Sequence, residues 1–187
     1  MNPGAAGTVV GSLTNVNGTL FFNGSDGIHG TELWKSDGTS AGTIMVKDIT
    51  PGGPSYLYPK YLTNVNGTLF FSVKNALWKS DGTSTGTIKL LEIASPASIS
   101  SLTNFNGTLF FQGTGGLWKS DGTAGGTTIV KVTAPSQLTV VNDTLYFASL
   151  ESSTGLELWR SDGTEVGTQL KPGSGTNGSD LKVPYEC

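Results

Sequence analysis

The strongest constraint on this chain is an internal repeat. The string LWKSDGTSAGT at 33–43 returns as LWKSDGTSTGT at 77–87, LWKSDGTAGGT at 117–127 and LWRSDGTEVGT at 158–168. Because a catalytic motif needs to occur only once, four copies point first to architecture. Evidence for function must then come from the places where the copies differ.

A second string precedes each copy and completes the repeat unit. It reads LTNVNGTLFF at 13–22 and 62–71, LTNFNGTLFF at 102–111 and LTVVNDTLYF at 138–147. Asn-Gly or Asn-Asp between two apolar runs predicts a β-hairpin, since these residues tolerate the positive φ of a tight turn. The LW string and the following β-branched run, GTIMVKDI at 42–49 in the first unit, predict two more strands. Each unit is therefore predicted to be a four-stranded antiparallel meander.

Such a sheet has two apolar faces that it cannot bury alone. Four sheets packed radially bury these faces against each other, so we predict an all-β fold, a four-bladed β-propeller closed into a ring with LTNV innermost. The rival fold, a stacked solenoid, needs polar end caps that the sequence does not show. The predicted divisions are an N-terminal strand-like extension at 1–11, the propeller at 12–171 and a flexible C-terminal tail at 172–187, with blades at about 12–52, 60–95, 100–133 and 136–171.

The repeated aromatic and acidic residues are predicted to be structural. A tryptophan in each unit supplies the bulk that a layer between blades needs, at Trp34, Trp78, Trp118 and Trp159. An aspartate before glycine can accept hydrogen bonds from the backbone of its own turn, at Asp37, Asp81, Asp121 and Asp162.

The string ELWKSDGTSAGT followed by VKDI resembles the ELWxxDGTxxGT (hyalin-like, propeller-like) repeats of bacterial secreted and surface proteins. The resemblance covers about residues 12–171, in four copies that are in phase. It implies a propeller-like array at an extracellular or cell-surface location, with no assigned activity. Two copies depart from the pattern, because Ala76 and Gly116 stand where Glu32 and Glu157 keep the glutamate.

Composition excludes several function classes. Only 13% of the residues are charged, the net charge is −3, and no cluster of lysine and arginine offers a surface for nucleic acid. No run of about 18 apolar residues predicts a membrane span. The first residues lack the basic and apolar regions of a signal peptide, so we expect a mature chain, export by another route, or an intracellular protein.

An enzyme is not expected. The chain has one histidine, His29, and one cysteine, Cys187, so a nucleophilic triad would have to use one of these two residues. Paired carboxylates at the channel mouth are the remaining catalytic alternative. Cys187, as a single thiol, is either a free group or a link to another molecule.

No cofactor is expected either. The alternative is a structural calcium ion held by Asp26, Glu32 and nearby carbonyls, or by carbonyls that ring the channel. Glycosylation sequons occur at Asn17, Asn23, Asn66, Asn106, Asn142 and Asn177. Four of these lie on the repeated hairpin turn, where asparagine suits the backbone, so they indicate glycosylation only if the protein is exported by a host that glycosylates.

The copies differ in one loop and at the termini. The loop before LW has ten residues at 23–32 and 148–157 but five at 72–76 and 112–116. In a closed ring the two long loops lie side by side and form a lopsided rim. GAAGTVVG at 4–11 resembles the fourth strand of a blade, so it either closes its own ring or pairs with a neighbouring subunit. The residues expected to mediate assembly are Thr8, Val9, Val10, Leu181, Val183 and Cys187.

The function expected from the sequence is that of a non-enzymatic extracellular structural protein. Its main partner would be itself, through head-to-tail exchange of terminal strands into a filament or surface layer. The alternative is a monomeric carbohydrate-binding (lectin-like) or adhesive module with glycans as partners. Tyr56, Tyr58 and Tyr61 in PSYLYPKY are the candidate sugar platform.

Overall fold

The structure is a computed structural model that describes residues 10–52, 57–94, 98–152 and 154–171. All regular secondary structure in these residues is β-strand. Blade one holds β1 (Val10–Val16), β2 (Thr19–Ser25), β3 (Thr31–Ser36) and β4 (Ile44–Lys47). Blade two holds β5 (Lys60–Val65), β6 (Thr68–Val73), β7 (Ala76–Ser80) and β8 (Ile88–Glu92). Blade three holds β9 (Ser100–Phe105), β10 (Thr108–Gly113), β11 (Gly116–Ser120) and β12 (Thr128–Lys131). Blade four holds β13 (Pro135–Val141), β14 (Thr144–Glu151), β15 (Gly155–Ser161) and β16 (Gln169–Leu170).

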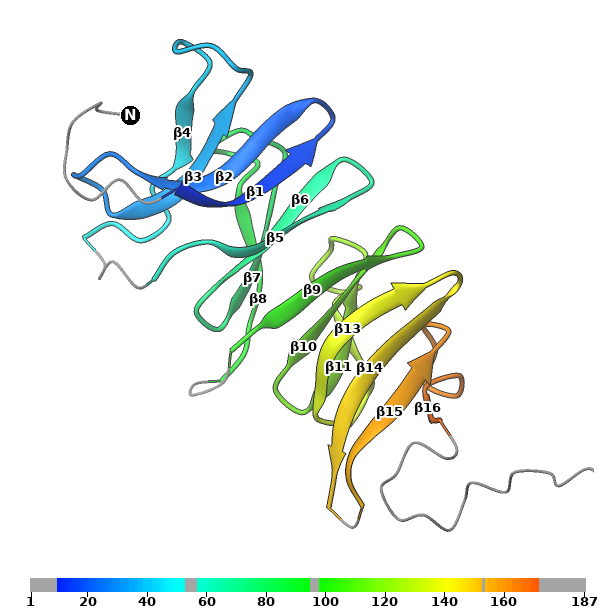
Figure 1. Ribbon diagram of the computed structural model, residues 1–187. Coiled ribbons are helices and arrows are strands. Elements are labelled where there is room, and N and C mark those ends of the chain that lie inside the picture. The colour runs from blue at the N-terminus through cyan, green and yellow to red at the C-terminus, as the bar shows by residue number, and fades with distance from the viewer. Residues whose placement is uncertain (1–9, 53–56, 95–97, 153, 172–187) are drawn as a thin grey trace, which may run out of the picture.

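The strands of each sheet lie in chain order, and each is antiparallel to the next. The first strands of successive sheets, β1, β5, β9 and β13, contact one another in that order and form the inner edge (Figure 1). The predicted all-β propeller layout of four meander blades is confirmed. The prediction that LTNV is the innermost strand is confirmed as well.

The blades do not close into a ring. Figure 1 shows blade one and blade four at opposite ends of an open arc. The expectation that their long hairpins lie side by side is therefore wrong. Four blades close into a ring only when each blade is rotated by about a quarter of a circle from the one before it. The rotations set by the side-chain layers between these blades do not add up to a full circle.

Each interblade layer uses the same positions of the repeat. We call the side of a blade toward the next blade its trailing face, and the side toward the preceding blade its leading face. The first layer joins trailing Val16, Phe21, Leu33 and Val46 to leading Leu69, Phe71 and Val73. Equivalent residues fill the layers between blades two and three and between blades three and four.

The tryptophans occupy the leading faces. Trp78, Trp118 and Trp159 pack against the three interblade layers, so their predicted role is confirmed. Each stacks on a phenylalanine of its own blade with ring centroids 6.0–6.3 Å apart. Trp34 is 6% exposed and stacks on Phe22 at 6.5 Å, although none of the described blades packs against its face.

Lysines join successive blades. Lys35 Nζ donates a hydrogen bond to the carbonyl of Gly82 in blade two at 2.8 Å. The same bond links Lys79 to the Gly122 carbonyl at 2.7 Å. The third such bond, from Lys119 to the Gly163 carbonyl, is 3.3 Å long. The lysine of LWKS is therefore a connector between neighbouring repeats.

The hairpin signals in the sequence correspond to the observed turns. Asn17 and Gly18 have φ of 51° and 83°, as a primed two-residue turn requires. Half of the ten-residue loop of blade one is strand, because Asn23, Gly24 and Ser25 pair with Leu33, Glu32 and Thr31. Blade four likewise extends its hairpin to the pair Glu151–Gly155. The long loops expected from the sequence are thus longer hairpins with short tips.

Candidate functional site

The predicted aspartates close the turn of each SDGTxxGT string. Asp37 Oδ1 accepts hydrogen bonds from the Thr39 backbone N–H at 2.9 Å and from its hydroxyl at 2.8 Å. These bonds lower the pKa of Asp37 below its usual range. Asp81, Asp121 and Asp162 accept the same pair of bonds, and their pKa values are lowered for the same reason. The four carboxylates hold turns together at the positions predicted for them.

The same carboxylate explains the second glycine of the string. A Cβ atom added to Gly42 would overlap the Asp37 carboxylate well inside van der Waals distance. Gly86, Gly126 and Gly167 face their own aspartates in the same way. The recurrence of DGTxxGT therefore needs no catalytic explanation.

A β-bulge recurs in the innermost strand of every blade, which sequence reasoning missed. The register of each first hairpin shifts at this point, and one residue has a left-handed φ of 54–56°. These residues, which we call the bulge row, are Ser12, Tyr61, Ser101 and Gln137. The threonine two residues later donates its hydroxyl to the bulge carbonyl, at 2.9 Å for Thr63 and Tyr61. A positive φ is costly for a bulky residue such as Tyr61, and bulges often redirect side chains toward a site.

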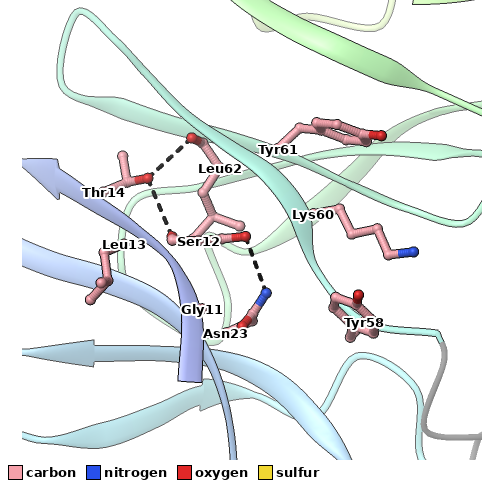
Figure 2. Close-up of a pocket in the computed structure, with 9 residues that line it drawn as sticks. All are labelled: Gly11, Ser12, Leu13, Thr14, Asn23, Tyr58, Lys60, Tyr61 and Leu62. Carbon is pink, nitrogen blue, oxygen red and sulfur yellow. Dashed lines mark hydrogen bonds between the residues drawn. The ribbon is translucent and has the colours of Figure 1, made fainter. Parts of the chain in front are cut away.

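Two members of the bulge row line a cavity between blades one and two. Its volume is about 610 Å³. Figure 2 shows β1 contributing residues 11–14 on one side and β5 contributing residues 60–62 on the other. Tyr58 lies at the entrance to β5 with the Lys60 ammonium 4.6 Å from its ring centroid. Tyr58 and Tyr61 of PSYLYPKY both line this cavity, and Tyr61 is 47% exposed. Tyr56 lies outside the described residues.

Asn23 forms the floor of this cavity and is 3% exposed. Its Nδ2 donates to the Pro59 carbonyl at 3.0 Å and to Ser12 Oγ at 3.2 Å. The amide thereby ties blade one to the strand entering blade two. A glycan on Nδ2 is incompatible with this packing, so the suggestion of Asn23 as a glycosylation site is wrong for the folded chain.

The turn sequons have a different environment. Asn17, Asn66, Asn106 and Asn142 are exposed at hairpin tips, with φ near 50°. Asn66 also donates to the Gly107 carbonyl of the next blade at 3.1 Å. Asn177 lies outside the described residues.

The acidic residues of the blade-one hairpin already have donors from the chain. Asp26 accepts from the backbone N–H groups of Ile28 and His29 at 2.9 Å, and its other oxygen lies 2.6 Å from His29 Nδ1. These contacts lower the Asp26 pKa, and the Asp26 carboxylate raises the pKa of His29. Glu32 is fully buried.

The Glu32 carboxylate accepts from Ile49 N and Thr50 Oγ1 at 2.8 and 2.7 Å, and burial raises its pKa. The geometry therefore does not support a calcium site at Asp26 and Glu32. Elsewhere in the described ranges, no group of three or more His, Cys, Asp or Glu side chains gathers to hold a metal ion. The described chain also contains no helix of the length and apolarity that crossing a bilayer demands.

Most residues expected to mediate assembly lie outside the described residues: Thr8, Val9, Leu181, Val183 and Cys187. Val10 is described, and it belongs to β1 rather than to a separate extension. The proposed N-terminal segment at 1–11 therefore overlaps blade one.

The outer faces of the arc expose residues that are buried inside it. Leu20 on the leading face of blade one is 37% exposed, whereas its counterparts Leu69, Leu109 and Leu145 are 0% exposed. Val141 on the trailing face of blade four is 50% exposed, whereas its counterparts Val16, Val65 and Phe105 are 3–6% exposed. The trailing face of blade four is thus an uncovered half of an interblade interface. On the leading face of blade one, Leu20 is uncovered, whereas Phe22 and Trp34 are only 2% and 6% exposed.

The comparisons with known proteins concern the fold. No protein-family model and no curated protein matches this chain. Among solved structures, the chain is similar to the crystal structure of puromycin hydrolase, with 15% sequence identity and a TM-score of 0.64. That match covers 92% of this chain and 30% of the hydrolase.

Two further matches agree. A mutant of puromycin hydrolase complexed with PGG is 17% identical, with a TM-score of 0.56 over 82% of this chain and 27% of that one. A prolyl endopeptidase structure is 14% identical, with a TM-score of 0.58 over 88% of this chain and 26% of that one. The neighbours are β-propeller-containing proteins, and this chain spans less than a third of their length. At these identities the likeness establishes a propeller fold and no activity.

Proposed function

We propose that this chain is a non-enzymatic structural protein whose propeller arcs join head to tail, outside the cell, into a filament or surface layer. The observation that carries the proposal is the apolar surface exposed at the two ends of the arc, at Leu20 of blade one and at Val141 and Leu158 of blade four. Exposed apolar area of this kind favours association, because burying it removes apolar surface from water. A head-to-tail contact that does not close produces a filament.

The described residues favour a structural role over catalysis. His29 is exposed and paired with Asp26, and within the described ranges no serine or cysteine side chain hydrogen-bonds to either side chain. The repeated aspartates hold turns. A hydrolase domain of the kind found in the structural neighbours would have to lie in sequence other than this propeller, since the match spans under a third of those enzymes.

The test is light scattering with negative-stain electron microscopy over a concentration series of the full chain. We expect the mass to rise with concentration and fibres or sheets to appear. A mass that stops at two copies would contradict the filament, because it would indicate a closed ring of two arcs. A monomer at every concentration would overturn the proposal.

A second candidate function is binding of carbohydrate in the cavity between blades one and two. Tyr58 and Tyr61 offer ring faces there, and Ser12 and Lys60 offer polar groups (Figure 2). This combination suits a sugar, which has both apolar faces and hydroxyls. A glycan array is the test: saturable binding to one sugar class that Tyr61→Ala abolishes supports it, and an array without binding removes it.

A further inference from the structure

We propose that a second copy of this chain packs its blade-one leading face on the blade-four trailing face, repeating the interface that occurs three times inside each chain. This inference rests on the proposed function and names its contact. The occupant is identified by the chain's own template, because each internal trailing face is covered by the leading face of a homologous repeat.

In each internal interface an aromatic ring covers a glycine of the next blade, and one such glycine is left uncovered. Phe21, Phe70 and Phe110 place their ring tips over Gly82, Gly122 and Gly163 of the next blade, so that a Cβ there would lie 3.0–3.3 Å from a ring carbon. Gly38 is the equivalent glycine of blade one. It is exposed, and a Cβ added there would meet nothing within 4 Å. Blade four offers the matching ring, since Tyr146 stands at the phenylalanine position.

The hydrogen bond from a basic side chain to this glycine is also missing at Gly38. Lysines of blades one to three donate to the carbonyls of these glycines. Arg160 replaces the lysine in blade four and is exposed. It pairs across the strands with Tyr146, as Lys35 pairs with Phe21. Arg160 can therefore donate to the Gly38 carbonyl of a second copy while Tyr146 covers Gly38 itself.

The inner edge supplies a third match. Asn64 Nδ2 donates to the Asn15 carbonyl of the preceding blade at 2.9 Å, and Asn104 donates to the Asn64 carbonyl at 3.0 Å. Asn15 Nδ2 has no acceptor among the described residues. Val140 holds the equivalent position in blade four and needs only its backbone carbonyl to accept this bond. The polar groups of blade four and blade one are thus matched at these two positions, Arg160 with Gly38 and Val140 with Asn15.

The contact has a direction. Inside the chain, the trailing face of blade one and the leading face of blade four are already covered. Each copy is left with one leading and one trailing face, which are different surfaces. Association must therefore be heterologous, head to tail, and not a symmetric pairing of like faces.

The experiment uses two variants in a Cys187→Ser background, which removes disulfide links. Leu20→Glu places a charge on the leading face of blade one, and Tyr146→Glu places one on the trailing face of blade four. Ile28→Glu and Val166→Glu are matched controls, since both residues are 83% exposed and lie at loop tips. The association of each protein alone, and of equimolar mixtures, is measured by light scattering.

We expect each face variant to raise the concentration of half-assembly at least tenfold, and the controls to leave it unchanged. A mixture of the two face variants should recover a dimer but nothing larger, because each supplies the intact face that the other lacks. This recovery also shows that both variants are folded.

Two outcomes would overturn the inference, and they separate it from the proposed function. If both face variants assemble like the parent protein while deletion of residues 1–9 abolishes assembly, the copies join by terminal strand exchange. The proposed function then stands without this interface. If the parent protein is monomeric at every concentration, both fall.

Discussion

Blades three and four have nearly the same repeat but different burial. Leu117 of blade three is fully buried, whereas Leu158 at the same position of blade four is 41% exposed. Phe105 is 3% exposed and its counterpart Val141 is 50% exposed. The residue types are apolar in both blades, so the difference in burial at these positions follows from the blade that covers blade three. At these two positions, the apolar residue is buried only in the blade that another repeat covers.

Blades one and two differ in how they satisfy one backbone N–H group. At the end of the fourth strand of blade one, Ile49 N donates to the Glu32 carboxylate at 2.8 Å. In blade two, where Ala76 replaces the glutamate, Ile93 N donates to the Asn75 carbonyl at 2.9 Å. The tighter β6–β7 turn brings that carbonyl within reach. The glutamate of the ELW string is thus absent from blade two, where the hairpin is shorter.

The largest expected effect tests the contrast between buried and outer positions. Leu109→Ala should lower the free energy of unfolding by about 3 kcal/mol, because it leaves a cavity in a closed layer. Leu20→Ala, at the equivalent exposed position, should cost less than about 1 kcal/mol in the monomer. Urea unfolding followed by tryptophan fluorescence measures both. Equal losses would show that the outer face is covered in the monomer.

The DGT turn should be independent of neighbouring blades. Gly126→Ala and Gly167→Ala should each cost about 2 kcal/mol, since the new methyl group meets the aspartate of its own turn. Gly125→Ala is the matched control, because nothing lies within 4 Å of a Cβ there. The same unfolding assay applies. A much larger loss in blade three than in blade four would contradict a turn that is internal to each blade.

The lysine connector should follow the same contrast as the leucines. Lys119→Ala should cost about 1 kcal/mol, because its ammonium bonds to the Gly163 carbonyl. Arg160→Ala should leave monomer stability within about 0.5 kcal/mol of the parent while weakening self-association. Comparison of unfolding at a concentration below assembly with light scattering above it checks both effects. A large stability loss for Arg160→Ala would show that it acts inside its own chain.

The bulge row should reveal its backbone strain through glycine. Tyr61→Gly should be more stable than Tyr61→Ala by about 1 kcal/mol, because alanine resists the left-handed backbone that glycine accepts. Gln137→Gly and Gln137→Ala in blade four should differ by the same amount. Thermal unfolding compares the pairs. A glycine variant that is less stable than alanine would contradict the left-handed bulge.

The smallest effect concerns the hairpin tip of blade one. The Asp26 carboxylate raises the pKa of His29 above its usual 6.5, so the pair stabilises the fold below pH 6.5. This stabilisation is lost as the pH rises through the raised pKa of the folded state. An NMR titration of the imidazole should give a midpoint above 6.5, and Asp26→Asn should return it toward 6.5. An unchanged midpoint in the variant would contradict the ion pair.

Parts of the candidate sites were predictable from the sequence and parts were not. The Asp-Gly turns were predictable because their hydrogen bonds connect residues two to four positions apart. The cavity between blades one and two was only partly predictable, since its tyrosines stand out in PSYLYPKY but its Asn23 floor comes from another blade. The bulge row carries residue types as different as Ser, Tyr and Gln, so no pattern marked it.

The sequence by itself determined the blade. Its hairpins, its turn aspartates, its interblade tryptophans and its strand order all follow from local spacing within one repeat, and these predictions are confirmed. Only the tertiary structure decided that four blades form an open arc and not a ring. Closure depends on the angle between successive sheets. The packing of Phe, Leu and Trp in each layer sets this angle, and the angles add up from blade one to blade four. The exposed faces of blade one and blade four, and the assembly contact inferred from them, follow from that sum.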